Sequence, residues 1–148
     1  MDGVSFAQGL LGGAILDRKL FWHFPHYTNQ GGRPSGAVRD GNWLLVELYD
    51  EKKAELYDLS ADIGEKQNLA NRHPACVAAM RAALDAWRKA NDVQYNTPNP
   101  NCVEDAFKAL YLDMDPSSFD PVTADVTAWA RIRQWRTGMD TAIRKKQE

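Results

Sequence analysis

The sequence predicts an α+β fold: a small four-stranded antiparallel sheet packed against one long helix, followed by a helical carboxy-terminal extension. Three observations lead to this prediction. Short segments rich in aromatic and β-branched residues follow one another between positions 19 and 59. Asp40-Gly41, the strongest short hairpin signal in the chain, separates two of them. After Pro74, apolar residues recur at spacings of three and four, the period of an amphipathic helix.

Four strands are expected before residue 60, at residues 19–24, 35–39, 43–49 and 54–59. The first is dense in aromatic residues and stops at Pro25, which cannot donate a ladder hydrogen bond. The charged turn at residues 50–53 joins the third strand to the fourth. Because two hairpins follow one another, the sheet should be antiparallel.

The long helix is expected from Pro74 to near Asn91, since proline is well tolerated at the first helical position. Its apolar stripe consists of Val77, Met80, Leu84 and Trp87. Such a stripe has to be buried, and the nearest apolar surface is one face of the sheet. We therefore interpret the stripe as core and not as a cofactor site.

Beyond the long helix, residues 92–102 read as a linker rich in asparagine and proline. A short helix at 103–110, a proline-bearing loop at 113–121 and a last helix at about 123–145 should follow. The apolar side of the last helix consists of Val126, Trp129, Ile132, Trp135, Met139 and Ile143. Burying each tryptophan would contribute roughly 2–3 kcal/mol. This helix should therefore dock on the sheet domain or belong against a surface outside the chain.

These elements suggest three segments: an irregular, glycine-containing lead-in at 1–17, a sheet-and-helix subdomain at 18–95, and a helical extension at 96–148. With 148 residues, the chain has room for one compact domain.

Composition excludes some partners and leaves the compartment open. The 18 basic and 20 acidic residues give a net charge of -2, so nothing favours nucleic acid. No apolar run approaches the roughly 20 residues that span a bilayer, and no export signal is apparent at the amino terminus. Cys76 and Cys102 form no C-x-x-C pair. A disulfide between them stays open, although two free, partly buried thiols are the preferred interpretation.

One polar and aromatic cluster is a candidate site. His23 and His26 lie three residues apart where the first strand should end, and Arg33 follows in a glycine-rich loop. Imidazole can donate to an anionic oxygen or transfer a proton, and a guanidinium suits a sulfate or a carboxylate. Alternatively, the histidines cap backbone groups and the aromatic residues pack. Without a neighbouring carboxylate, the two histidines make a poor metal site.

At this cluster the chain resembles the carboxy-terminal portion of bacterial sulfatases of the arylsulfatase type, in the alkaline-phosphatase-like superfamily. The resemblance is carried by LFWHFPHYTNQGGRPSGAVRDGNWLLVELYD at 20–50 and AELYDLSADIGEKQNLA at 54–70. The opening Asp2-Gly3-Val4-Ser5 is similar to a segment that precedes this region in the family. The resemblance extends to about residue 100 and is loose beyond Cys102.

The resemblance implies the same fold, four antiparallel strands and a long helix, and a hydrolase of sulfate esters. In the family, a formylglycine made from a C/S-x-P-x-R motif attacks sulfur beside a calcium ion held by aspartates and an asparagine. This chain has no such motif: Val77-Ala78 follow Cys76, and Val103-Glu104 follow Cys102. The family's calcium ligands lie upstream. No catalytic residue and no metal ligand are therefore expected here.

The resemblance also assigns His23 and His26 to the portion that closes over the substrate, a sulfated glycan or an aryl sulfate. With Arg33, they are the predicted substrate-binding residues. Leu44 departs from the family, since many relatives have a lysine at that position in the third strand. Any role of that lysine is lost here.

Three functional hypotheses follow. The chain is a sulfatase fragment inactive alone, a non-catalytic subunit that pairs with a separate catalytic portion, or an unrelated small domain whose loop captures an anion. Sulfatases of this type are often periplasmic or secreted, but the sequence itself does not locate the chain. A sheet face shaped to sit against a catalytic domain should also promote self-association.

Overall fold

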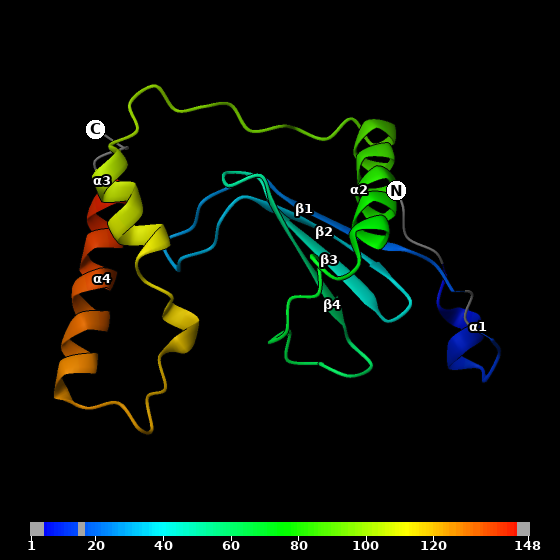
Figure 1. Ribbon diagram of the computed structural model, residues 1–148, viewed down its shortest axis with the longest axis horizontal. Helices are drawn as coiled ribbons and strands as arrows, with labels where there is room; N and C mark the ends of the chain where they lie inside the picture. Colours follow the sequence, from blue (N-terminus) through cyan, green and yellow to red (C-terminus); the bar gives the residue numbers. More distant parts are fainter. Residues whose placement is uncertain (1–4, 15–16, 145–148) are drawn as a thin grey trace. The chain divides into compact units, whose positions relative to one another are not determined.

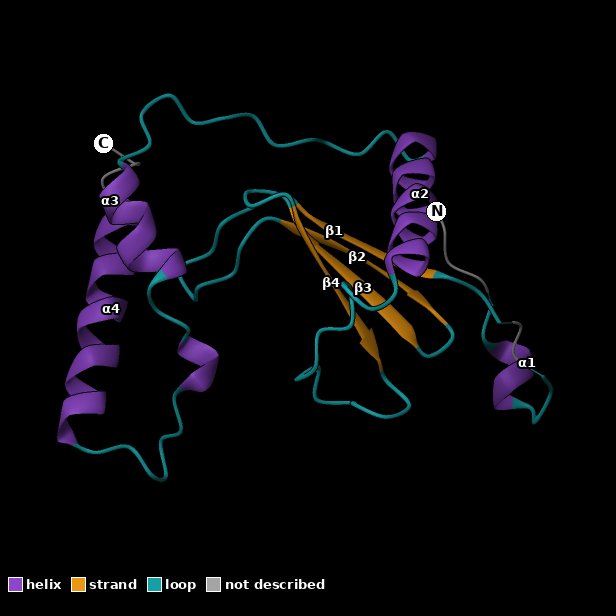
Figure 2. Cartoon of the chain, in the orientation of Figure 1, coloured by secondary structure: helices purple, strands orange, loops and turns teal. Residues whose placement is uncertain are grey.

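The computed structural model describes residues 5–14 and 17–144 (Figure 1). The opening Asp2-Gly3-Val4 and the basic residues Lys145 and Lys146 lie outside the described residues. The fold is α+β as predicted: a four-stranded antiparallel sheet, a 17-residue helix and a long carboxy-terminal helix (Figure 2). The chain divides into two compact units.

The sheet has strand order β1-β2-β3-β4, so each strand pairs with its neighbours in sequence. The strands are β1 (Leu20–Phe24), β2 (Ser35–Asp40), β3 (Trp43–Leu48) and β4 (Lys53–Asp58). Each boundary lies within one residue of its prediction. The β2–β3 hairpin turns at Gly41, whose φ of +57° is a conformation that favours glycine.

The first unit comprises residues 1–22, 37–46 and 54–91. Its helix α2 (Pro74–Ala90) places Met80 and Leu84 in a buried cluster with Val38, Leu45 and Leu56 from three strands. Val77 and Trp87 pack against this cluster, so the entire predicted stripe is core. A single-turn helix, α1 (Ala7–Leu10), lies within the predicted irregular lead-in.

Neighbouring residues of a strand point to opposite faces of the sheet. The cluster is built from one face, and the strand residues between its members point to the other. In the first unit, we call Leu20, Trp22, Leu44 and Val46 the second sheet face. Leu20, Leu44 and Val46 are partly buried, whereas Trp22 is 49% exposed. A four-stranded sheet with apolar residues on both faces normally has a covering layer on each.

The second unit comprises residues 23–36, 47–53 and 92–148. After the linker come α3 (Glu104–Phe107), a π-helix at Lys108–Leu112, a 3-10 turn at Pro116–Ser118 and α4 (Val126–Arg144). The π-helix is a difference from the predicted short helix at 103–110. Its wider turn is closed by the Asp113 amide, which donates to the Lys108 carbonyl at 2.9 Å.

The last helix buries part of its apolar stripe within the second unit. Met139 is 1% exposed and Trp135 is 9% exposed, and the Trp135 indole N–H donates to the Leu110 carbonyl at 2.9 Å. Trp129 stays 37% exposed and meets Phe119 edge-on. Of the two tryptophans, Trp135 is thus buried and Trp129 is only partly buried. The side chain of Ile143 lies outside the described residues.

Cys76 and Cys102 are both free thiols. Cys76 is partly buried beside Met80, with its sulfur 3.7 Å from the methionine sulfur, whereas Cys102 is exposed and not partly buried as expected. Within residues 5–14 and 17–144, no helix is both long and apolar enough to cross a membrane.

Candidate functional site

The candidate site is the loop between β1 and β2, together with the turn between β3 and β4 in the same unit. Two hydrogen bonds between Thr28 and Gly32 hold the loop in a tight turn. The Thr28 amide donates to the Gly32 carbonyl at 2.9 Å, and the Thr28 hydroxyl accepts from the Gly32 amide at 2.9 Å. A Cβ on Gly32 would lie 2.6 Å from that hydroxyl, and Gly31 has a φ of +86°. The tight loop therefore requires both glycines.

Arg33, the cation of this loop, binds the turn between β3 and β4, which we call the acidic turn because it contains Asp50 and Glu51. Its Nε donates to Asp50 at 3.0 Å and its Nη2 donates to Asp50 at 2.8 Å, a bidentate pair. The same Nη2 donates to Glu51 at 2.7 Å. The side chains of Arg33 and Asp50 are only 17% and 12% exposed. Charge-assisted bidentate pairs are among the strongest hydrogen bonds in proteins, so the positive charge of Arg33 is already balanced.

The pKa values of Asp50 and Arg33 are shifted in the directions expected for an ion pair. Burial alone would raise the pKa of Asp50, but hydrogen bonds from Arg33 and Tyr27 outweigh it and leave that pKa below its usual range. Burial likewise opposes the charge of Arg33, yet its bonds to Asp50 and Glu51 raise its pKa. The group is therefore an ion pair near neutral pH.

Tyr27 joins this pair to an aromatic cluster. Its hydroxyl donates to Asp50 at 2.9 Å, and burial, followed by this hydrogen bond, raises the pKa of Tyr27 well above its usual value. Its ring contacts Tyr111 with centroids 4.8 Å apart and Phe107 with centroids 5.7 Å apart. The Tyr111 hydroxyl in turn donates to the Thr28 carbonyl at 3.2 Å. The loop is thus fixed to the segment that contains α3 and the π-helix.

His23 has a partner on each ring nitrogen. Its Nε2 lies 2.7 Å from the Gln94 carbonyl, which can only accept, so Nε2 carries a hydrogen. Its Nδ1 lies 2.8 Å from the Tyr49 hydroxyl, which donates to it when the imidazole is neutral. The ring also contacts Tyr49 and, edge-on, Tyr95. His23 is a structural link between β1, the acidic turn and the linker.

His26 differs from the other two predicted residues. It is exposed, and its ring meets Phe24 edge-on with centroids 5.5 Å apart. The structure gives His23, His26 and Arg33 separate sets of partners and does not gather them around one point. Of the three, His26 has the side chain most available to a ligand.

Sequence reasoning missed the acidic half of this site. It treated Asp50 and Glu51 only as turn residues between two strands, although antiparallel pairing returns that turn toward the β1–β2 loop. The ion pair could have been predicted from the opposite charges of Arg33 in the loop and of Asp50 and Glu51 in the turn.

The chemistry of these donors does not suit a calcium site. Both carboxylates, Asp50 and Glu51, are engaged by Arg33, and no group of three or more histidine, cysteine, aspartate or glutamate residues gathers as a metal site anywhere in residues 5–14 and 17–144.

Comparison with known proteins places the chain beside sulfatases. No family model matches it. It is 31% identical over 115 residues to a sulfatase of Formosa agariphila, a match that covers 69% of this chain and 21% of that protein. It is 40% identical over 53 residues to an N-acetylgalactosamine-6-O-sulfatase of Bacteroides thetaiotaomicron, covering 36% of this chain and 10% of that protein.

A solved 2-O GAG sulfatase structure is 24% identical, with a TM-score of 0.48, and the match covers 66% of this chain and 23% of that one. The chain spans about a fifth of the Formosa relative and a tenth of the Bacteroides relative. The sequence matches confirm the resemblance to the carboxy-terminal portion of a bacterial sulfatase. The chain is a sulfatase-related segment.

Proposed function

We propose that this chain is a non-catalytic carboxy-terminal module of an arylsulfatase-type enzyme, without turnover of its own, that acts together with a catalytic portion. The similarity over 115 residues to a sulfatase carries the proposal. The absence of a C/S-x-P-x-R sequence from the 148 residues supports the lack of independent activity.

The second sheet face supports the pairing with a catalytic portion. Its residues Leu20, Leu44 and Val46 are apolar, and Trp22 leaves about half of its surface in water. A contiguous apolar face is the kind of surface at which proteins associate. We assign this face to the contact with the catalytic portion.

The loop after β1 is proposed to border the substrate, a sulfated glycan or an aryl sulfate. His26 is the residue proposed to touch it, because its imidazole is exposed and can donate to an anionic oxygen. His23 and Arg33 are proposed to hold the loop in place from behind, through Tyr49 and Asp50.

An independent anion-binding domain is less well supported. Such a domain would need the positive charge of Arg33 to face its ligand. Asp50 and Glu51 already accept from this guanidinium at 2.7–3.0 Å. A ligand would have to displace two carboxylates to reach it.

Turnover of an aryl sulfate tests the proposal. The purified chain should show none, with or without added calcium. A version of the Formosa sulfatase that lacks the 115 matching residues should regain activity when this chain is co-expressed with it. In that complex, His26→Ala should raise KM more than it lowers kcat, whereas Arg72→Ala, at an exposed position outside the loop, should change neither. Turnover by the chain alone, or no effect of the chain on the shortened enzyme, would contradict the proposal.

A further inference from the structure

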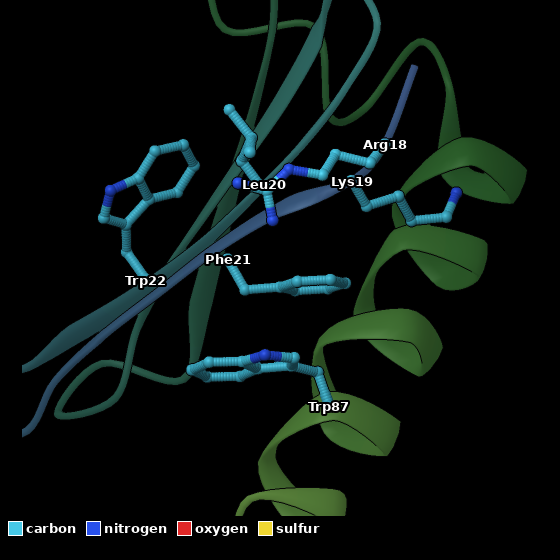
Figure 3. A pocket seen from close by; sticks show the side chains of 6 residues that line it. All are labelled: Arg18, Lys19, Leu20, Phe21, Trp22 and Trp87. Atoms are coloured by element: carbon cyan, nitrogen blue, oxygen red, sulfur yellow. The ribbon is translucent and has the colours of Figure 1, made fainter. Parts of the chain in front are cut away.

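β1, the strand that leads into the candidate site, is held in the first unit by aromatic stacking. The ring of Phe21 lies on that of Trp87 in α2, with centroids 5.3 Å apart and planes 6° from parallel, beside a hollow of about 280 Å³ (Figure 3). The first unit includes this strand only as far as Trp22. The β1–β2 loop belongs to the second unit, so the contacts that fix the loop come from there.

The carboxy-terminal extension touches this loop in two places. A Cβ on Gly31 would lie 3.0 Å from Cγ of Pro116 and 3.3 Å from Cζ2 of Trp135, so the loop main chain packs against the 3-10 turn and α4. The second place is the Thr28 carbonyl, which accepts from the Tyr111 hydroxyl at 3.2 Å. The loop is thus supported by α4 directly and by the π-helix.

The two contacts are connected, because Trp135 also holds the π-helix that presents Tyr111. Leu110 lies in the last turn of that helix, where carbonyl groups have no partner within the helix. The Trp135 indole N–H donates to the Leu110 carbonyl at 2.9 Å. A Cβ on Gly138, one turn further along α4, would lie 2.9 Å from Cδ2 of Leu110, so the two helices approach closely. Trp135 therefore supports the loop by direct contact and, through Leu110, by way of Tyr111.

Trp135 is suited to this role because its own side chain is fixed. It is buried in the second unit, and close-packed side chains transmit a displacement instead of absorbing it. Trp129 on the same helix is far more exposed and contacts Phe119. The two tryptophans of α4 therefore form a matched pair, one against the loop and one in contact with Phe119.

We propose that the carboxy-terminal extension sets the position of His26, with Trp135 and Tyr111 as its positioning residues. Tyr27, which follows His26 in the chain, has its ring against that of Tyr111 with centroids 4.8 Å apart. The exposed imidazole is thus presented next to a residue that the extension holds. A displacement of about 1 Å in a binding group is enough to weaken its contact with a ligand. What His26 binds rests on the function proposed above, whereas its position does not.

Amide hydrogen exchange of the 15N-labelled full chain tests the support of the loop. The reporters are the amides of Thr28 and Gly32, which both form hydrogen bonds within the loop. Tyr111→Phe keeps the ring and removes the hydroxyl, and Trp135→Phe keeps an aromatic ring and removes the indole N–H. Each variant should speed exchange of the two reporters by about two- to tenfold, as expected for the loss of one hydrogen bond.

Two controls separate this local effect from a general loss of stability. The Leu69 amide, which donates to the Leu56 carbonyl in the first unit, should exchange at its wild-type rate in both variants. Trp129→Phe makes the same substitution on the same helix and should leave the Thr28 and Gly32 amides unchanged. If Trp135→Phe does not fold, as judged by circular dichroism, Tyr111→Phe at its partly buried position still decides the proposal.

The native-state NMR spectrum reports the position of His26 itself, which a change in stability alone would not move. The His26 ring lies edge-on to Phe24 with centroids 5.5 Å apart, so the ring current of Phe24 contributes to the shifts of the His26 ring protons. Tyr111→Phe and Trp135→Phe should move these shifts toward those of a histidine in a free peptide. Trp129→Phe should leave them as in wild type.

Turnover in the complex with the shortened Formosa sulfatase tests the consequence for substrate. There Trp135→Phe should raise KM for the aryl sulfate about two- to tenfold, with a smaller change in kcat. No turnover in that complex would contradict the function proposed above, and the exchange rates and His26 shifts of the chain alone would still decide the positioning role.

Four results would overturn the proposal. They are wild-type exchange and wild-type His26 shifts in Tyr111→Phe and Trp135→Phe, equal acceleration of the Leu69 amide, the same changes in Trp129→Phe, or an unchanged KM for Trp135→Phe in an active complex.

Discussion

Arg33 illustrates, at the scale of single residues, how neighbours decide what a side chain can do. In the sequence it is a cation in a loop beside two histidines, a pattern typical of an anion site. In the structure its guanidinium is held by Asp50 and Glu51, and Asp50 also accepts from Tyr27. The same charge thus holds the loop to the turn that contains Asp50 and Glu51.

Removing the guanidinium should therefore destabilise the second unit. Arg33→Ala leaves Asp50 with a side chain only 12% exposed and without its main partner. We expect the free energy of unfolding to fall by about 1–3 kcal/mol, measured by urea denaturation at pH 7. Arg39→Ala is the control, because Arg39 is exposed and its Nε donates to the carbonyl of Gly41 in the β2–β3 turn. Equal losses in the two variants would contradict the structural role of Arg33.

The Asp50 carboxylate should give this stability a pH dependence of known sign. Because hydrogen bonds hold the pKa of Asp50 below its unfolded value, its contribution is fully present above about pH 4 and is lost as pH falls through the folded pKa. The difference in unfolding free energy between wild type and Asp50→Asn should therefore shrink on acidification from pH 5 to about pH 2.

Asp92→Asn removes the same charge at an exposed position whose φ of +46° asparagine also adopts. The difference in unfolding free energy between wild type and Asp92→Asn should change little between pH 5 and about pH 2. A constant difference for Asp50→Asn would exclude a linked ion pair.

The φ of Gly32 is not positive, so its backbone conformation does not require glycine. What requires glycine at this position is the lack of space for a side chain. Gly32→Ala would place a methyl group 2.6 Å from the Thr28 hydroxyl, so either the loop or that side chain must move. We expect a loss of about 1–3 kcal/mol in unfolding free energy. The double variant Thr28→Ala/Gly32→Ala should lose less than the sum of the single changes, because the clash disappears with the hydroxyl. Strict additivity in denaturation experiments would show that the contact is unimportant.

Elements with a strong local pattern could be predicted from the sequence, and elements set by distant contacts could not. The stripe of α2 and the hairpin at Asp40-Gly41 are local signals, and both hold in the structure. The π-helix at Lys108–Leu112 has no local signal. Its Leu110 carbonyl is paired with the indole of Trp135, 25 residues away.

The same distinction applies to the candidate site. His23, His26 and Arg33 are visible as residue types in one loop, whereas their partners Tyr49, Asp50 and Gln94 come from other segments. Which of the three stays available depends on those partners. Only the folded chain reveals that His26 is the exposed one.

At the scale of elements, Leu84 is the point at which α2 closes the core of the first unit. It is fully buried in the cluster with Leu45 and Leu56. Leu84→Ala should cost about 2–5 kcal/mol of unfolding free energy, from lost burial and from the cavity it leaves. Ile63→Ala removes an aliphatic side chain that is 82% exposed and should change stability by less than about 0.5 kcal/mol. Similar losses in urea denaturation would mean that α2 is not packed on the sheet.

At the scale of the whole molecule, the second sheet face is where we expect the isolated chain to associate with itself. α2 supplies the core on one face, and Leu20, Trp22, Leu44 and Val46 lie on the other. Apolar surface that is buried in a complex promotes association when the partner is missing. We therefore expect the isolated chain to self-associate as its concentration rises, measured as average mass by light scattering.

Leu44→Lys tests which surface is responsible, because it places a charge on the second sheet face at the inner strand β3. The variant should stay monomeric at concentrations where wild type associates. Ile63→Lys adds the same charge at an 82% exposed loop position and should associate as wild type does. A wild-type chain that stays monomeric would remove the evidence for an association surface. Equal relief by both variants would point to net charge and not to this face, since added charge by itself opposes association.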